Sequence, residues 1–474
     1  MHPNLRTFCL FSLFIFAASA SAPSFRCPTY IDTVVPSGQD RHYGKREPGD
    51  PFLATMHDVH NALSTCSGIK SLKLRVTELG CSEWPDRWSF PFELSSKSHY
   101  PSRLEVLDLE GYQFDDSAWE EASQPPYRTN SRFWDNVEWL GSGRAWNWLR
   151  WLSLSQEQKA KTNLDLWLEV MDFSYIKELA LRQTRNHTSD LRPLIPQLKS
   201  LRSLTVTGQW AKDFILELPE NSLTSLSWLF SGETGASVLP VLRHHAHSLT
   251  RLEWREAESG HRQRKVMTPE QIAEIGRMVP NLKKLTLDIN RNGTWPMEHL
   301  EALATNFPKL ANLTIFFEIA SECRRQLEGS WGQSSYYSIR KPDDEPLPCK
   351  GIDSMAQPLL DHANAFKLFE FLREKKVGDE ITKAAFYAGD WERPWDGALA
   401  EDRWLDGRRA FVVCEAVANG GTGGELVDKR ILCQGIDTKI ASARSQSGYD
   451  EDHGPFDDVA WRSGLADRAW RMEL

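Results

Sequence analysis

One spacing recurs nine times along this chain of 474 residues: an apolar residue, two others, a second apolar residue, one other, and a third apolar residue. Five of the eight intervals between successive starts lie between 22 and 28 residues, and the other three require insertions. The last two apolar residues are two positions apart, which predicts a short strand with both side chains on one face. One unit alone has too little core, so neighbours must stack. The segments begin at Ile69, Leu104, Leu149, Ile176, Leu201, Leu223, Leu249, Leu282 and Leu310.

The stretches between these segments carry helical patterns. Leu164, Trp167 and Met171 recur at the spacing of one helical face. Thr268-Pro269 precedes a second such pattern, and Thr followed by Pro is typical of a helix start. A strand on one side and a helix on the other predict a curved α/β solenoid of about nine irregular repeats.

The regions outside the repeats indicate four parts of the chain. An apolar run from Phe8 to Ala18 follows Arg6 and precedes small residues, which predicts a signal peptide. Elsewhere no apolar run reaches the length of about 18 residues that a membrane helix needs, so we expect no membrane span. The predicted parts are 1–20, a signal peptide; 21–50, an extended segment or pro-segment ending near the dibasic Lys45-Arg46; 51–320, the solenoid with an N-terminal cap; and 321–474, a C-terminal α+β capping module.

The cysteines and sequons favour the secretory route. Six of the seven cysteines left after signal removal fall into neighbouring pairs, which predicts disulfides, although six cysteines allow 15 pairings. Cys27 is the odd one, and a cut after Arg46 would remove it. The predicted pairs are Cys66 with Cys81, Cys323 with Cys349, and Cys414 with Cys433, and the predicted glycosylation sites are Asn186, Asn292 and Asn312. We expect a secreted protein; the alternative is the endoplasmic reticulum, because the chain ends in Glu473-Leu474.

The segment from Asn281 to Asn290 resembles a complete leucine-rich-repeat consensus, a repeat with a period of 20–29 residues. The other segments lack the final Asn, so the array is more similar to irregular repeats of ribonuclease-inhibitor-like and fungal F-box-associated proteins. It also resembles secreted fungal proteins with such repeats, through Ala62 to Cys66 and Gly80 to Trp88. No F-box precedes the array. The resemblance covers about residues 50–320 and implies a binding role without catalytic activity.

The concave face of such a solenoid is its usual recognition surface. It carries the residues that flank the two apolar strand positions. In its middle we expect a small polar floor made of Ser203, Thr205, Thr207, Ser225 and Ser227. We expect a protein or glycan ligand there; the alternative is a solvated face without a partner. The predicted ligand-binding residues are Arg75, Asp108, Trp151, Arg182, Arg251, Arg255, Lys284 and Asp288.

Signatures of catalysis are missing from the sequence. His244-His245-Ala246-His247 has no acidic or Cys partner beside it, which favours a solvated loop over a metal site. We therefore predict no catalytic residue, no metal and no cofactor. The net charge of −9 disfavours nucleic acid as a partner. The sequence favours a secreted, non-catalytic binding scaffold such as a fungal effector; the alternatives are a structural or ER-resident protein and an enzyme with an unrecognised site in residues 321–474.

Overall fold

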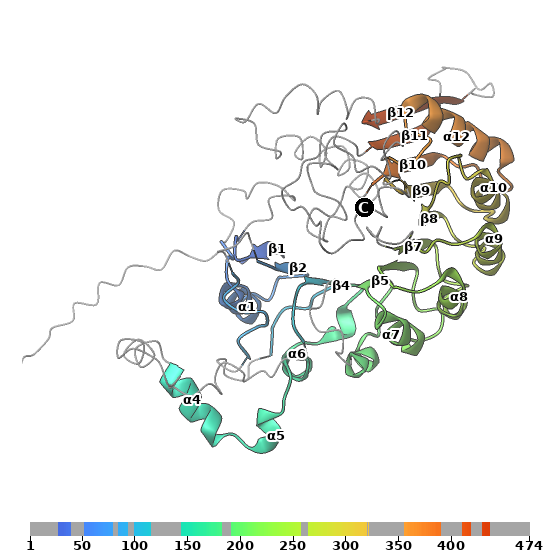
Figure 1. The fold of residues 1–474 in the computed structure, drawn as a ribbon. Coiled ribbons are helices and arrows are strands. Elements are labelled where there is room, and N and C mark those ends of the chain that lie inside the picture. The colour runs from blue at the N-terminus through green and yellow to red at the C-terminus, as the bar shows by residue number, and fades with distance from the viewer. Residues whose placement is uncertain are drawn as a thin grey trace, which may run out of the picture.

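A single twelve-stranded sheet organises the described part of the chain, in a mixed α/β fold that does not close into a barrel. The computed structural model describes residues 27–38, 52–78, 84–92, 99–114, 144–182, 191–256, 264–319, 321, 355–389, 410–418 and 429–436. The strands follow one another in chain order from β1 to β12. The sheet curves so that strands line the inner side of an arc and helices its outer side (Figure 1).

The strands are parallel from β1 to β10, and β11 and β12 continue the sheet antiparallel. They are β1 Tyr30–Val35, β2 Ser71–Val76, β3 Val106–Glu110, β4 Glu178–Arg182, β5 Ser203–Thr207, β6 Ser225–Leu229, β7 Arg251–Arg255, β8 Lys284–Ile289, β9 Asn312–Phe317, β10 Lys383–Ala388, β11 Ala410–Ala418 and β12 Lys429–Ile436. The helices are α1 Met56–Thr65, α4 Arg144–Ser153, α5 Gln156–Lys159, α6 Asn163–Val170, α7 Ala211–Glu217, α8 Gly235–His244, α9 Pro269–Met278, α10 Met297–Asn306 and α12 His362–Lys375, with 3-10 turns η2 Phe173–Tyr175 and η3 Arg192–Gln197.

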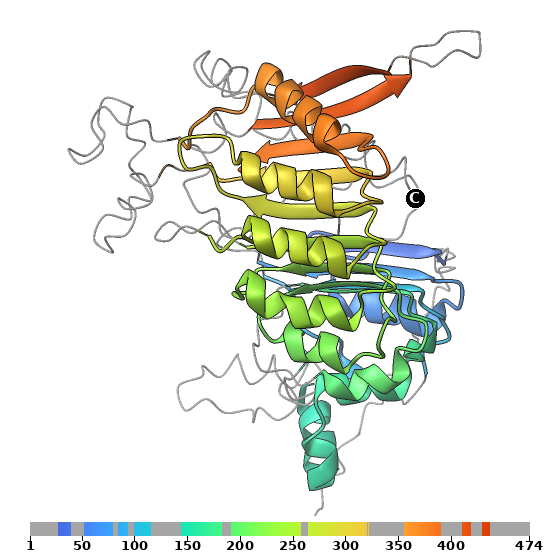
Figure 2. The ribbon, with the colours of Figure 1, turned by 90° about the vertical axis from the view of Figure 1, so that its right-hand side faces the viewer.

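Eight of the nine predicted repeat segments form strands, β2 to β9, with their apolar pairs in register. Leu72 lies opposite Leu107, and Leu107 lies opposite Leu179. All three are buried. The helices α7 to α10 run side by side along one face of the sheet (Figure 2). Alternation along the strands therefore directs the intervening residues to the other face of the sheet.

The return helices form where the sequence predicts them. Thr268 caps α9 through a capping box with Gln271, and Pro269 occupies the first turn. Gly276 faces the backbone of Asn306 in α10, and an added Cβ there would lie 2.5 Å from its carbonyl oxygen. A glycine at this position thus permits the close approach of α9 and α10.

The predicted repeat at Leu149 is wrong, because this segment is the helix α4. β3 pairs directly with β4, which leaves no strand for this segment between them. Leu149 and Leu152 are 50% and 46% exposed. Their three-residue spacing also fits a helix face, and the surrounding Trp, Leu and Arg residues tolerate a helix.

The sheet extends beyond both predicted boundaries of the repeat region. β1 lies within residues 21–50, and β10 to β12 lie after residue 320. β1 was missed because Thr33 stands where a large apolar residue is expected; its hydroxyl donates to the carbonyl oxygen of Leu53 at 2.7 Å. β10 carries the repeat spacing at Ile381, Ala384 and Phe386, but the small Ala conceals it.

Two disulfides lie in the described residues. Cys414 and Cys433 face each other across β11 and β12 and are bonded, as predicted. The predicted pairing of Cys66 with Cys81 is wrong: Cys66 is bonded to Cys27, with 5.4 Å between their Cα atoms. Pairing of β1 with β2 brings Cys27 back to the end of α1, so a cut after Arg46 would leave it covalently attached. Cys81, Cys323 and Cys349 lie outside the described residues.

Candidate ligand-binding face

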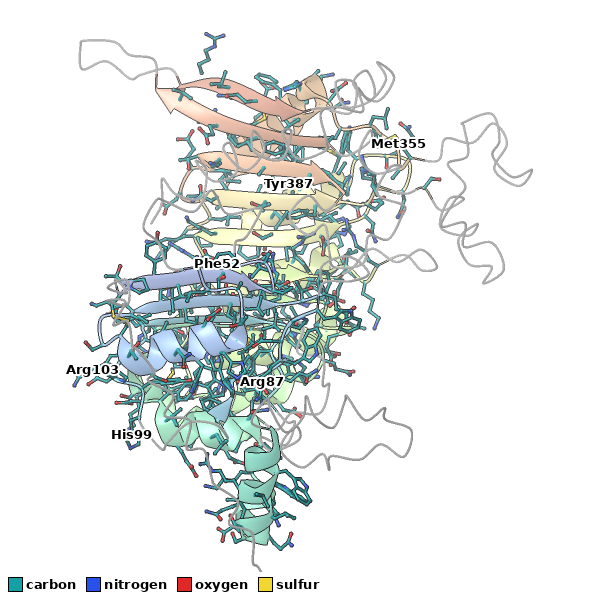
Figure 3. All side chains as sticks on the ribbon, turned by 90° about the vertical axis from the view of Figure 1, so that its left-hand side faces the viewer. Phe52, Arg87, His99, Arg103, Met355 and Tyr387 are labelled. Atoms are coloured by element: carbon teal, nitrogen blue, oxygen red, sulfur yellow. A yellow bond between two sulfur atoms is a disulfide. The ribbon has the colours of Figure 1, made fainter. Side chains whose placement is uncertain are left out.

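The sheet face opposite the helices carries three rows of side chains that cross the strands. Each strand has two apolar residues that point toward the helices. The first row is made of the residues just before the first of these two, the second row of the residues between them, and the third row of the residues just after the second. On β7 these positions are Arg251, Glu253 and Arg255. Figure 3 views the molecule from the open side of the arc, with Tyr387 of the third row labelled on β10. The rows differ sharply in exposure: Arg251 is exposed, whereas Arg255 is 2% exposed.

The predicted ligand-binding residues on β2 to β4 pair with charges on neighbouring strands. Arg75 Nε lies 3.2 Å from Glu110 Oε2, and both side chains are 12% exposed. Asp108 Oδ2 lies 3.5 Å from Arg182 Nη2 on the next strand. Opposite charges on adjacent strands stabilise the sheet. On β2 to β4, the charged side chains of this face are therefore partly neutralised by one another.

Arg255 and Asp288 also contact each other, in the buried third row. Arg255 Nε lies 3.4 Å from Asp288 Oδ1, and the side chains are 3% and 0% exposed. The Arg255 guanidinium carbon lies 3.3 Å from the ring centroid of Phe316, a cation–π contact. The structure thus places these two predicted ligand-binding residues in the interior.

A ladder of carboxylates links consecutive units at the ends of the strands. Glu256 Oε2 accepts from the backbone N–H of Gly232 at 3.0 Å, and Asp288 Oδ2 accepts from that of Glu256 at 2.6 Å. Glu318 Oε1 accepts from the backbone N–H of Arg291 at 2.5 Å. Each acid thus satisfies a backbone donor of the preceding unit, as buried donors require. The sequence analysis did not predict this ladder, because it looked for Asn at the last position of the leucine-rich-repeat consensus and not for acidic residues near it.

Arg264 joins the ladder from the segment that leads into α9. Its Nη1 donates to Asp288 Oδ1 at 3.0 Å, and its Nε donates to Asn290 Oδ1 at 3.0 Å. Asn290 Nδ2 donates back to the Arg264 carbonyl at 3.1 Å. Burial raises the pKa of the Glu256 and Glu318 carboxyls. Burial and several hydrogen bonds per side chain are typical of a network that fixes the interior.

The accessible polar surface lies on the first two rows from β5 to β10. The first row carries Arg251, Lys284, Asn312 and Lys383 on four consecutive strands, of which Arg251 is exposed and the others are half-buried. Lys383 Nζ lies 2.8 Å from Glu415 Oε1 on β11. Burial lowers the pKa of the Lys284 ammonium, and the positive charges of Arg251 and Lys383 lower it further.

Four of the five predicted floor residues are half-buried, whereas Thr207 is buried in the third row, and the floor continues further than expected. Its members are short hydroxyl side chains on β5, β6, β8 and β9, next to the cations. The Ser227 hydroxyl donates to Glu253 Oε2 at 2.5 Å. The floor consists of Ser203, Thr205, Ser225, Ser227, Thr286 and Thr314.

Aromatic rings occupy the third row from β9 to β11, which the sequence did not predict. The rings of Phe316 and Tyr387 stack with centroids 4.4 Å apart, and Tyr387 stacks on Phe411 at 5.4 Å. All three are at most 9% exposed and form a second apolar cluster with Ala385. The signal was available, because each ring stands at the third-row position of its strand.

The remaining predicted sites are distributed over the fold. Trp151 lies on α4, so its predicted place on the sheet face is wrong. Asn292 is exposed in the turn after β8, Asn312 lies in the first row, and Asn186 lies outside the described residues. His245 is buried, and burial lowers its pKa to about 4.

Two features are absent from the described residues. No group of three His, Cys, Asp or Glu side chains there could hold a metal ion. Within the same ranges, no helix is both long and apolar enough to cross a membrane. Comparison of the sequence with models of known protein families and with curated proteins finds no match.

Proposed function

We propose that this chain is a secreted leucine-rich-repeat solenoid that binds a protein or glycan ligand on the first two rows of the sheet face, without catalysing a reaction. The division of this face carries the proposal. The described side chains of its third row are buried and bonded to one another in ion pairs, the carboxylate ladder and stacked rings. The first two rows, by contrast, carry polar groups that are exposed or half-buried. Solenoids use such curved faces for recognition.

The order of strands and helices supports the repeat assignment. Strands follow in chain order with their apolar pairs in register, and the return helices that the structure describes from α7 to α10 cover the same face of the sheet (Figure 1). This is the arrangement expected when each unit contacts only its neighbours. The disulfides Cys27–Cys66 and Cys414–Cys433 support an oxidising compartment, as in secreted proteins.

The location is tested by expression with the native leader in a fungal secretion host. Mass spectrometry of the medium and the cell fraction measures where the protein accumulates and whether its thiols are oxidised. We expect oxidised protein in the medium. Retention in the cells with free thiols would contradict a secreted scaffold.

Binding is tested with random-peptide display and a glycan array. The double substitution Thr205→Trp with Thr286→Trp places two bulky rings on the half-buried floor and should abolish binding at this face. Glu217→Trp, on the exposed surface of α7, adds the same side chain behind the sheet and should leave binding unchanged. Probes that bind the floor variant as well as the parent would refute the proposed site.

A further inference from the structure

We infer that the edge of the sheet at the amino-terminal ends of β5 to β9 is a second binding site, for a linear polysaccharide that carries carboxylate groups. The edge consists of the loops that lead into these strands, and it contains none of the floor residues. The inference therefore goes beyond the proposed function. The loops are residues 198–202, 218–224, 245–250, 279–283 and 307–311.

Positive charge dominates this edge, although the chain as a whole has 56 basic and 65 acidic residues. The five loops, all of which the structure describes, carry four exposed Lys or Arg side chains and one exposed acid, Glu220. Arg251, the exposed first residue of β7, adjoins them as a fifth cation. Lys199 interacts electrostatically with Asp172, so the inference rests on Arg251 and the other three cations. The cations of the loops are Lys199, Arg202, Lys283 and Lys309.

Arg202, Arg251, Lys283 and Lys309 have no acidic partner among the described residues. Arg202 Nη1 donates to two backbone carbonyl oxygens at 2.9 and 3.4 Å. Lys309 Nζ donates to the amide oxygen Oδ1 of Asn281 at 2.8 Å. These partners are neutral, so they leave the charge of each cation uncompensated.

The backbone holds the loops in line across the strands. In each loop but the last, one carbonyl oxygen accepts the N–H groups of two residues of the next unit; these oxygens belong to Arg202, Thr224, Thr250 and Lys283. Neighbouring strands are about 4.8 Å apart, so the four intervals from the loop before β5 to the loop before β9 span about 19 Å. Successive cations are one or two intervals apart, which is comparable to the Debye length of about 8–10 Å. A chain of negative charges along the edge therefore meets a continuous positive field.

The groups between the cations favour a polysaccharide over an acidic peptide. The carbonyl oxygens of the edge are already used by the sheet, so an occupant is recognised by side chains and not by added backbone hydrogen bonds. The hydroxyls of Thr224 and Thr250 each donate to a backbone carbonyl oxygen at 3.1 Å, and their oxygen atoms can still accept. Cations beside hydroxyl acceptors complement a ligand that has both carboxylate and hydroxyl groups.

Nucleic acid and membrane fit this edge less well. Phe307 is the only Phe, Tyr or Trp of the five loops, and it is 1% exposed, so no ring is available for stacking on bases. The loops also lack an exposed large apolar side chain that could insert into a lipid surface.

The test measures binding of polygalacturonate to the full secreted chain, beside its methyl ester, which lacks the negative charge. Lys283→Glu with Lys309→Glu should weaken binding of polygalacturonate by at least about tenfold, because two attractions become repulsions. Arg277→Glu with Lys367→Glu makes the same change of charge at exposed positions of α9 and α12 and should leave binding nearly unchanged, because salt screens distant charges.

A gain of affinity separates the inference from loss of folding. Glu220→Gln removes the acid of the edge and should tighten binding by about twofold. Lys283→Arg with Lys309→Arg keeps the charge and should bind as the parent does. Equal binding of polygalacturonate and its methyl ester, or no effect of the charge reversal, would overturn the inference. Polyglutamate or single-stranded DNA bound as tightly, with the same dependence on the variants, would also overturn it.

The floor variant distinguishes this site from the proposed one. Thr205→Trp with Thr286→Trp should leave polygalacturonate binding unchanged, because neither residue belongs to the edge. Loss of binding in that variant would place the polysaccharide on the floor, which overturns the inference and leaves the proposed function standing. Binding that depends on Lys283 and Lys309 alone supports the edge site whether or not the floor binds a ligand.

Discussion

Replacing Asp288 by Ala should destabilise the protein strongly, because this carboxylate is the most heavily used acceptor of the buried ladder. Its side chain is 0% exposed. Oδ1 lies 3.0 Å from Arg264 Nη1 and 3.4 Å from Arg255 Nε, and Oδ2 accepts from the Glu256 N–H at 2.6 Å. Removing one partner from a buried ion pair costs about 3–5 kcal/mol, since it leaves an uncompensated charge. We expect a loss of free energy of unfolding in that range.

The assay is urea unfolding followed by far-UV circular dichroism at pH 7. The midpoint should fall while the slope with urea stays constant, because the substitution leaves the surface exposed on unfolding unchanged. Glu253→Gln is the control. Glu253 lies on the same face of the sheet as Asp288 but is half-buried, so we expect the free energy of unfolding to change by less than about 1 kcal/mol. A loss below about 1 kcal/mol for Asp288→Ala would refute the ladder and return Asp288 to the candidate ligand residues.

A second substitution tests the electrostatic origin of the loss. In the Asp288→Ala background, Arg255→Met removes one of the two buried cations left without this carboxylate. Methionine can keep a contact with the Phe316 ring, on which the guanidinium now lies. The double variant should therefore be more stable than the sum of the single losses, with a coupling of about 1–3 kcal/mol. Strict additivity would show that packing, rather than the unpaired charge, causes the loss.

Three further predictions concern stability. Burial lowers the folded-state pKa of His245 from 6.5 to about 4, so the unfolded chain binds protons first and stability falls as pH drops through that window; His245→Met should remove up to about 3 kcal/mol of this loss between pH 7 and pH 4 in urea titrations. Cys27→Ser opens a link between residues 39 apart and Cys414→Ser one between residues 19 apart, so thermal unfolding should show losses of about 4 and about 3 kcal/mol. Gly276→Ala should cost about 1–3 kcal/mol in urea unfolding despite the better helix propensity of Ala, because its Cβ would collide with α10; a gain in stability would contradict this packing.

The sequence predicted most strands because one physical rule generates them. Two apolar residues that are two positions apart on a strand must be covered by another layer of the protein. Leu285, Leu313 and the equivalent residues of the other strands are buried between the sheet and the helices. The rule fails where a different side chain meets the same need. Thr33 fills an inward position by bonding a carbonyl, and the small Ala384 fills another, where it is fully buried.

The rule also fails where the spacing arises in another element. Leu149 and Leu152 match the repeat but lie on an exposed helix, since a three-residue interval fits both structures. The wrong pairing of Cys66 with Cys81 also follows from an element that the spacing rule did not identify. Cys27 could be assigned to Cys66 only with β1 in the sheet, and β1 is hidden by Thr33.

The candidate site shows a further limit, because residues of one type on one strand face have opposite environments. Arg251 and Arg255 are four positions apart on β7, yet the first is exposed beside Lys284 and the second is buried against Asp288. The repeat spacing predicts the register with β8, but it does not show that Arg264 and the Phe316 ring cover the third row and bury Arg255. The fold thus gathers opposite charges in the buried third row, where Arg255 and Asp288 bond to each other, and leaves Arg251 of the first row exposed to solvent. Residue type alone therefore does not separate an interior charge from a surface charge on this face, because the packing around each row decides its exposure.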